Sequence, residues 1–446
     1  MFKQKNKENL KKSLLIGASS ATLLGSLVTG TVHPVKAQGP DIDGDASITV
    51  DYDTGQILQG KDIDEPLGIA SMSKMLVEYI VFEEIEEDKI SWDTEITISE
   101  YAHQVSQDYS LSNVPLREGD QYTLEELYEA MAIYSANGAT IAIAEEIEGS
   151  EPDFVDRMRS TVESFGIDDA HIVNATGLNN SDLQGNTYPD TEEDDENMMS
   201  ARSVAKINDR IVRDYPEILD IASIPEKTFR EDTVDSIEMI NWNLMLEGLS
   251  YEREGVDGLK TGTTNHAGPT FTGTATQDDR RLITVVMNSG EDVEDLTTRF
   301  AETDKMMDYG FDDFTFENVT ENWDEQLDYK PLPVENGKAD EVDYEPSEEL
   351  EMLIEKNDDL EEDLTYSVEW DSDIVNEDGA VEAPLKEGME VGYLVVEYSG
   401  NELGNLNGDE GSKVPIVTTE SVDKAGVFGR SWNWITDFFK SIFNRF

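Results

Sequence analysis

The order of apolar and polar residues predicts strands near the start of the chain and again well past its middle. Residues alternate over Ser47–Tyr52, a turn follows at 53–55, and a short return covers Gln56–Leu58. This pattern is typical of two strands joined by a tight turn. The apolar run within Arg281–Met287 predicts a buried strand, and Val293–Tyr309 predicts a helix after it.

The middle of the chain favours helices. A strongly apolar stretch opens at Gly68–Ser71 and continues to Phe82, and apolar residues recur at helical spacing over Leu124–Tyr134 and Ala139–Ile147. The segment Asn174–Asn197 is different, because it is polar and acidic, contains glycine and asparagine, and has no clear periodicity. We therefore expect a long loop there, and long loops in compact domains are often functional.

A change in composition near Asp312 predicts a second, smaller domain. The residues from there to about Asp363 are acidic and include prolines. Beyond them, short apolar stretches such as Thr365–Glu369 and Gly392–Glu397 alternate with glycine-bearing turns, which is typical of β-structure. We predict one domain over 42–312, in which strands flank a helical middle, and a β-rich domain over 313–422.

Residues 1–37 predict an export signal. A lysine-rich start is followed by an apolar, small-residue stretch over Leu14–Val32, and Val35-Lys36-Ala37 offers the small residues that a signal peptidase accepts. The alternative is a single N-terminal anchor helix. The short length and the Ser, Gly and Thr content disfavour that alternative, so we expect the mature chain to be exported.

An amphipathic helix is predicted at the other end of the chain, over 428–446. Its large apolar residues share one helical face: Trp432, Ile435, Phe439, Ile442, Phe443 and Phe446. Arg430, Lys440 and Arg445 make this end locally basic. The helix is too short to span a bilayer, but it suits the membrane interface. The alternative is packing on the protein's own core, which such dense apolar content at a terminus disfavours.

Composition narrows the classes of partner. The chain has 446 residues, no cysteine, and 98 acidic against 33 basic side chains, for a net charge of −65. Such a surface repels nucleic acid, so we exclude nucleic acid as a partner. Without disulfides the fold must rest on its core. Because the acidic residues are spread along the whole chain, we hypothesise adaptation to high external salt, which screens their repulsion.

Common metal and triad sites have no support in the sequence. The histidines of the predicted mature chain are His103, His171 and His266, and none belongs to an H-E-x-x-H pattern. There is no cysteine to bind a metal, so we predict neither a catalytic zinc nor an organic cofactor. A Ser-His-Asp triad lacks its G-x-S-x-G turn.

A lysine can instead serve as the base for a serine nucleophile. The S-x-x-K pattern would place both on one face of the first turn of a helix. Its copies begin at Ser71, Ser203 and Ser421, those of S-x-N at Ser135, Ser399 and Ser431, and the single K-T-G at Lys260. Chain order leaves one triplet, formed by Ser71, Ser135 and Lys260.

The surroundings of this triplet resemble the serine D,D-carboxypeptidases, the low-molecular-mass penicillin-binding proteins. Ile69–Met75 looks like the family's nucleophile segment, Ser135–Ala139 like its second motif, and Gly255–Thr264 like its third, with its Val-Asp-Gly lead-in. Val173–Leu178 and Met199–Ala205 also resemble family segments. The resemblance covers about 42–312 well and the later parts more loosely.

Three positions depart from the family pattern. Ser73 stands where threonine is common and Ala136 where glycine is common, and both replacements are small. Trp242 precedes Asn243 where some members carry an arginine. The last departure leaves open how the carboxylate of the substrate is held.

The resemblance implies a transpeptidase-like α/β (α+β) domain with K-T-G on an edge strand, and it implies roles for the motif residues. Ser71 would attack the bond between the two D-alanines of a peptidoglycan stem peptide, and Lys74 would take its proton. Ser135 would relay a proton to the departing D-alanine, and Asn137 would orient the substrate. The residues expected to hold the terminal carboxylate or to line the oxyanion hole are Lys260, Thr261, Gly262 and Thr263.

The same resemblance implies that β-lactams acylate Ser71. The export signal and the C-terminal helix predict that the enzyme works at the outer face of the cytoplasmic membrane or in the cell wall. Two other readings remain. A class A β-lactamase shares the three motifs and adds a loop glutamate, for which Glu193 and Asn197 offer an E-x-x-x-N pattern. A non-catalytic cell-wall binding module is the second alternative. Endopeptidase or transpeptidase activity in the same site also stays open.

Overall fold

The computed structural model describes residues 39–290, 295–321, 323–327, 329–408 and 412–426. The predicted export signal at 1–37 and the predicted amphipathic helix at 428–446 lie outside these residues. Within them, no helix combines the length and the apolar character needed to cross a membrane.

An antiparallel sheet of five strands, in the order β2-β1-β11-β10-β9, forms the centre of the first domain. The strands are β1 (Ala46–Asp51), β2 (Ile57–Lys61), β9 (Val256–Thr264), β10 (Gly268–Gln277) and β11 (Arg280–Met287). Segments far apart in the sequence lie side by side in this sheet, since β1 pairs with β11 from Ala46↔Met287 to Asp51↔Leu282. The strands predicted at 47–52, 56–58 and 281–287 are confirmed, and β9 lies at an edge of the sheet.

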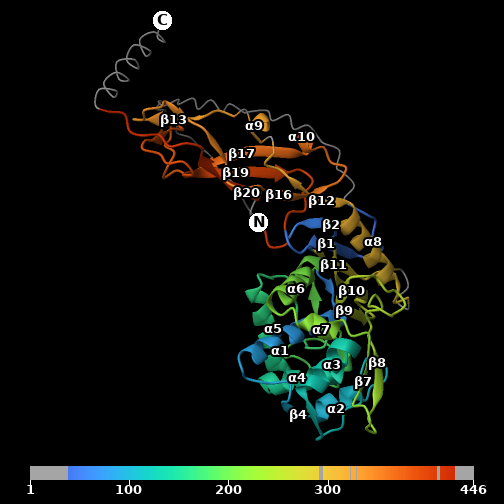
Figure 1. Cartoon of the computed structure of the whole chain (residues 1–446). Coiled ribbons are helices and arrows are strands. Elements are labelled where there is room, and N and C mark those ends of the chain that lie inside the picture. The colour runs from blue at the N-terminus through green and yellow to red at the C-terminus, as the bar shows by residue number, and fades with distance from the viewer. Residues whose placement is uncertain (1–38, 291–294, 322, 328, 409–411, 427–446) are drawn as a thin grey trace, which may run out of the picture. The chain divides into compact units, whose positions relative to one another are not determined.

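Helices cover both faces of this sheet, as Figure 1 shows. Successive side chains of a strand point to opposite faces, and β11 fills both with apolar residues. Leu282 and Val286 belong to a core that includes Phe300 of α8 (Thr298–Asp312). Ile283 and Val285 belong to the larger core made with the other helices. A strand that is buried on both faces accounts for the unbroken apolar run in the sequence.

α8 begins later than the predicted Val293. Asp295 Oδ1 accepts hydrogen bonds from the backbone N (3.0 Å) and from Oγ1 (2.6 Å) of Thr297. An aspartate that bonds to the backbone two residues on forms a turn that competes with helix. The helix therefore starts at Thr298.

The remaining elements of the first domain surround the sheet. Its other helices are α1 (Lys74–Glu86), α2 (Glu100–Ser106), α3 (Leu124–Tyr134), α4 (Asn137–Glu148), α5 (Glu151–Ser164), α6 (Ala201–Asp214) and α7 (Ile218–Ala222), with 3₁₀ turns η1 (Ala70–Ser73) and η2 (Asn180–Asp182). Short strand pairs are β3 (Leu67–Gly68) with β6 (Met198–Met199), β4 (Glu95–Thr97) with β5 (Gln121–Thr123), and β7 (Glu226–Phe229) with β8 (Ile237–Ile240).

α1 is the central helix of the domain. Its residues from Lys74 to Val81 are all buried, so polar side chains on it are enclosed by the other helices. A helix that is apolar on almost every side belongs in a core. The nucleophile segment was expected in the first turn of this helix. Ser71 instead lies in the preceding turn η1, whose first residue, Ala70, has φ +45°, and Lys74 is the first residue of α1.

The second domain is β-rich, as predicted. A four-stranded antiparallel sheet has the order β15-β20-β19-β17, β13 lies between β14 and β18, and β12 pairs with β16. The elements are β12 (Phe314–Asn318), α9 (Trp323–Gln326), β13 (Leu332–Glu335), β14 (Glu341–Val342), β15 (Tyr344–Pro346), β16 (Glu351–Glu355), α10 (Leu360–Asp363), β17 (Leu364–Trp370), β18 (Val381–Glu382), β19 (Glu390–Tyr398) and β20 (Ser412–Thr418). Its own hydrophobic core includes Val391, Leu394 and Val414.

Candidate active site

The turn from η1 into α1 places a lysine against a serine. Lys74 Nζ lies 2.9 Å from Ser71 Oγ, 2.8 Å from Asn137 Oδ1 and 2.7 Å from the carbonyl O of Thr176. A neutral amine has two N–H donors and one lone pair. Since the amide oxygen of Asn137 and the carbonyl of Thr176 can only accept, they take the two donors. The lone pair of a neutral Lys74 then faces the hydroxyl of Ser71.

The surroundings of Lys74 favour that neutral form. The side chain is fully buried, and burial is the main reason why the pKa of Lys74 lies well below its ordinary value of 10.5. The positive charge of Lys260 lowers this pKa further, while Glu78 and Glu151 raise it. Burial and a like charge both disfavour the ammonium form. Lys74 is thus able to accept a proton from Ser71.

The second motif forms the junction between α3 and α4. Ser135 ends α3 in the left-handed conformation (φ +59°, ψ +32°), and Asn137 begins α4. Ser135 Oγ is buried and has no hydrogen-bond partner in the part of the chain that the structure describes. Asn137 is held from the other side, because its backbone N and Nδ2 both donate to the carbonyl O of Ser112 at 3.0 Å.

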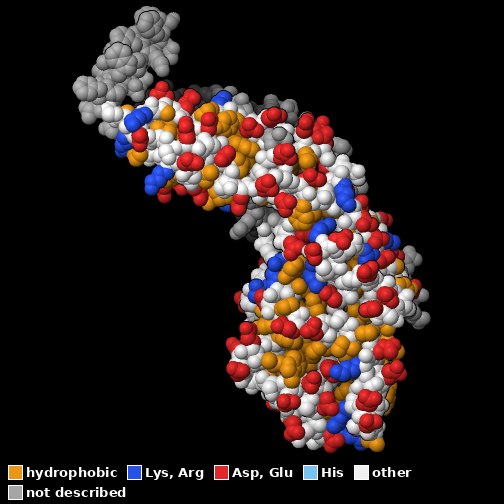
Figure 2. Space-filling model, viewed as in Figure 1, with side chains coloured by type: hydrophobic (Ala, Val, Ile, Leu, Met, Phe, Trp, Pro, Cys, Tyr) orange, Lys and Arg blue, Asp and Glu red, His pale blue; other side chains and the backbone are white. Residues whose placement is uncertain are grey.

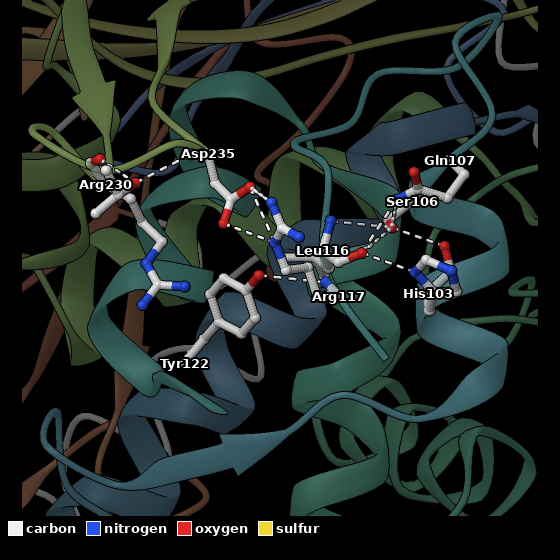
Figure 3. Close-up of polar contacts among 9 residues, drawn as sticks. His103, Ser106, Gln107, Leu116, Arg117, Tyr122, Arg230 and Asp235 are labelled. Atoms are coloured by element: carbon white, nitrogen blue, oxygen red, sulfur yellow. Dashed lines mark hydrogen bonds and ion pairs between the residues drawn. The ribbon is translucent and has the colours of Figure 1, made fainter. Parts of the chain in front are cut away.

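The segment that supplies this carbonyl is itself anchored at its far end. The carbonyl O of Leu116 lies 2.7 Å from Nδ1 of His103 and 3.0 Å from Nε2 of Gln107, at the end of α2. The guanidinium of Arg117 bonds both carboxylate oxygens of Asp235, between β7 and β8. Figure 3 shows Leu116 beside the α2 side chains and Arg117 pointing toward Asp235. The anchored segment fixes Asn137 and hence one acceptor of Lys74.

The third motif lies on the edge strand β9, close to the nucleophile turn. A Cβ added at Gly262 would come within 2.7 Å of the carbonyl O of Ile69 and 3.0 Å of Cβ of Ala70, so glycine permits this close approach. Lys260 is buried, and within the described residues its Nζ makes one hydrogen bond, at 3.4 Å to the carbonyl O of Thr261. Burial lowers the pKa of Lys260 to about 8.

A buried arginine lies behind the third motif. Nη1 of Arg299, on α8, donates to the carbonyl O of Gly262 at 2.9 Å and to Oγ1 of Thr263 at 3.0 Å. Its charge lowers the pKa of Lys260. Trp242, which stands where some relatives have an arginine, bonds the carbonyl O of Tyr134 through its indole N–H at 3.1 Å. Arg299 belongs to none of the sequence motifs described above.

A buried asparagine network holds the loop that presents Thr176. Asn174 Oδ1 accepts hydrogen bonds from the backbone N of Thr176 (3.1 Å) and Gly177 (2.7 Å). Asn197 Nδ2 donates to the carbonyl O of Asn174 and to Oγ of Ser73, both at 2.8 Å. Buried polar groups with all their partners fix one conformation. The expected long loop is therefore largely held in place beside the site by hydrogen bonds. Its irregular sequence does not show which of its residues make these bonds.

Gly177 lies where this loop touches the nucleophile turn, and we expect Gly177→Ala to distort the site. Its φ is +75°, and an added Cβ would lie 1.8 Å from the carbonyl O of Ala70. The loop must then move and take the Thr176 carbonyl with it. Gly185→Ala is the matched control, because its φ is +84° and no atom of the described residues lies within 4 Å of its added Cβ.

Both variants should lose about 1–2 kcal/mol from the left-handed backbone alone. Thermal unfolding and the rate of acylation by penicillin separate them. Gly177→Ala should unfold at a clearly lower temperature than Gly185→Ala and react at least about tenfold more slowly. Equal behaviour of the two variants would show that the contact with Ala70 does not matter.

The other copies of S-x-x-K have different surroundings. Ser203 Oγ, on α6, donates to Asp169 Oδ1 at 2.6 Å, and Ser421 Oγ accepts from the backbone N of Glu387 at 2.9 Å.

Glu193, the candidate glutamate of a β-lactamase, is exposed, whereas Asn197 is buried in the asparagine network. Across the described part of the chain, no group of three or more His, Asp or Glu side chains is placed to hold a metal ion.

Comparison with known proteins shows which proteins this chain is similar to. The family model described as D-alanyl-D-alanine carboxypeptidase matches residues 33–291, and that of the penicillin-binding protein 5 C-terminal domain matches 324–424. The chain is 28% identical to the D-alanyl-D-alanine carboxypeptidase DacC of Escherichia coli, over 95% of this chain and 96% of that protein. The corresponding values for DacF of Bacillus subtilis are 27%, 85% and 86%.

Solved structures extend the similarity. A peptidoglycan synthesis regulatory factor (PBP3) from Streptococcus pneumoniae is 34% identical, with a TM-score of 0.64 over 86% of this chain and 100% of that one. Penicillin-binding protein 5 from Haemophilus influenzae is 26% identical, with a TM-score of 0.61 over 87% and 100% of the two chains.

Proposed function

Because this chain belongs to the family of D-alanyl-D-alanine carboxypeptidases, we propose that it removes the terminal D-alanine from peptidoglycan stem peptides through an acyl-enzyme on Ser71. The observation that carries the assignment to Ser71 is the position of Lys74. Its buried amine lies 2.9 Å from Ser71 Oγ, and the other two groups that it contacts, Asn137 Oδ1 and the carbonyl O of Thr176, can only accept. This arrangement favours proton transfer from Ser71 to Lys74.

Acylation begins with attack of Ser71 Oγ on the carbonyl carbon between the two D-alanines. The proton of Ser71 passes to Lys74 as the new C–O bond forms. The C–N bond then breaks, and the departing amine receives a proton by way of Ser135. The hydroxyl of Ser135 is buried and has no hydrogen-bond partner among the described residues, which supports this role because the hydroxyl can bond to the leaving group. Water then attacks the ester, which releases the shortened peptide and restores Ser71.

The negative charge of the substrate's terminal carboxylate is complementary to positive charge in the site. The carboxylate of the terminal D-alanine would bind Lys260 and the hydroxyls of Thr261 and Thr263, with Arg299 adding a second positive charge behind the strand. The N–H groups of Ser71 and Thr263 would form the oxyanion hole. Thr263 lies opposite Pro269, whose carbonyl O accepts a hydrogen bond from the backbone N of Ser289 at 2.9 Å. In the described part of the chain no strand pairs with the outer side of β9, which supports an N–H of Thr263 that points away from β10. Gly262 allows this strand to approach Ser71.

Release of D-alanine from a peptide ending in D-Ala-D-Ala tests this function. The product is measured with D-amino acid oxidase, and the same peptide ending in L-Ala-L-Ala serves as the control substrate. Release from the first peptide alone is expected, and its loss in Ser71→Ala assigns the nucleophile. Folded protein that releases no D-alanine contradicts the proposal.

The surface and the two ends of the chain bear on where this reaction takes place. We propose export directed by residues 1–37 and attachment to the membrane surface by residues 428–446, on the basis of their sequences. Acidic side chains are spread over the face seen in Figure 2. We propose that this surface suits high salt, so the unfolding temperature should rise from dilute buffer to molar salt. An unchanged unfolding temperature would reject this adaptation.

A further inference from the structure

A buried carboxylate lies on the same helix as Lys74, and the reaction described above does not use it. Glu78 lies on α1 one helical turn after Lys74, and its side chain is 1% exposed. Its Oε2 has no hydrogen-bond partner within the described residues, and neither has the buried hydroxyl of Tyr128 on α3. A buried acid without such partners is costly unless a nearby opposite charge compensates it.

The charges that act on Glu78 are those of the active site. Burial raises the pKa of Glu78 to about 7, while the positive charges of Lys260 and Lys74 oppose this shift. In return, Glu78 raises the pKa of both lysines. Tyr128 has a pKa well above its ordinary value, mainly through burial, and so stays neutral.

Further charges reach the lysines from neighbouring elements. Glu151, at the start of α5, raises the pKa of Lys74, and Arg299, on α8, lowers that of Lys260. Asn137, at the start of α4, meets Lys74 through its neutral amide. Among the described carboxylates, Glu78 is the one that acts on both lysines.

We propose that Glu78 is a positioning residue whose buried carboxylate is the shared counter-charge of Lys74 and Lys260. It stabilises the ammonium that Lys74 becomes on taking the Ser71 proton, and it keeps Lys260 charged for the substrate's carboxylate. Without it, Lys74 is a weaker base and Lys260 loses its proton at a lower pH. This inference rests on the proposed function, because it concerns the same acylation step.

The test compares variants of Glu78 by the pH dependence of acylation. Glu78→Gln keeps the shape of the side chain and removes the charge. Glu78→Met also removes the charge and suits an apolar site, so it should fold even if glutamine is poorly tolerated. The matched control is Glu84→Gln on the same helix, whose carboxylate is also buried but pairs with Lys89 at 2.8 Å.

The acylation rate constant with a penicillin is measured from pH 5 to pH 10. Both limbs of the profile should move to lower pH in the Gln and Met variants, by about one pH unit, because removal of a nearby negative charge lowers the pKa of each lysine. The maximal rate should also fall. Glu84→Gln should lose stability and leave both limbs in place.

Folded Gln and Met variants whose limbs coincide with those of the wild type would overturn this role. Equal shifts of the two limbs in Glu84→Gln would also overturn this role, because loosening of the helix would then explain the shifts. If the wild type releases D-alanine and either of these two results is obtained with the variants, only the role of Glu78 is refuted. A wild-type protein that neither reacts with penicillin nor releases D-alanine refutes the proposed function and this inference together.

Discussion

Replacement of Lys74 by methionine is expected to slow the acylation of Ser71 by roughly 10³–10⁵-fold, because the serine loses the base that lies beside its hydroxyl. The thioether keeps a similar length and fills the same buried space. It cannot accept the proton of Ser71 or donate to Asn137 and Thr176. The folded structure should therefore persist while the chemistry stops. The acylation rate with penicillin and the thermal unfolding temperature are measured on the same sample.

Lys206→Met is the matched control for this experiment. Lys206 belongs to a second S-x-x-K pattern, but its Nζ contacts the carbonyl O of Gly166 at 3.3 Å in an exposed position, while Ser203 bonds Asp169. The Lys206→Met variant should react with penicillin at the wild-type rate. A Lys74→Met variant that keeps more than about a tenth of that rate would exclude Lys74 as the base and require a different proton acceptor.

Replacement of Lys260 by methionine is expected to lower kcat/KM for a D-Ala-D-Ala peptide by roughly 10²-fold. A charge-assisted hydrogen bond contributes about 1.5–3 kcal/mol, and each 1.4 kcal/mol is a factor of ten. The pH profile should change as well. In the wild type, the pKa of Lys260 near 8 sets the alkaline limb, because the lysine must be charged to bind a carboxylate.

In Lys260→Met this alkaline limb should disappear. The acidic limb should move to higher pH, since the charge of Lys260 lowers the pKa of Lys74. A peptide with an amidated C-terminus is the comparison substrate, because it has no carboxylate to lose. If the variant and the wild type differed equally on the free and amidated peptides, Lys260 would not be the carboxylate site.

The sequence predicted the parts of the fold that depend on strong local patterns. The helix expected over Leu124–Tyr134 has those bounds in the structure, because apolar spacing and a capping box at Thr123 and Glu126 agree. The β-strand character of Arg280–Met287 follows from burial on both faces. β9 and β10 were less visible, because glycines and threonines dominate them and their pairing depends on the rest of the sheet.

The site was predicted unevenly for a similar reason. Serine and lysine at fixed spacing in η1 and α1 are a local feature, so Ser71 and Lys74 could be proposed from the sequence. The carbonyl of Thr176 could not, because any residue has one and only tertiary folding brings it to Lys74. The same holds for Arg299 and Glu78, because both act on Lys260, which is distant from them along the chain.

The central claim is that Ser71 forms a slowly hydrolysed acyl-enzyme, and intact-mass measurement after addition of penicillin tests it most directly. The protein without residues 1–37 and 428–446 is followed over time in buffer of high salt. The account predicts a gain of one penicillin molecule that persists for many minutes and is absent in Ser71→Ala. Rapid hydrolysis of the drug with no lasting adduct would identify a β-lactamase instead. Folded protein that shows neither adduct nor hydrolysis would contradict the account, and the non-catalytic cell-wall binding module would be the remaining interpretation.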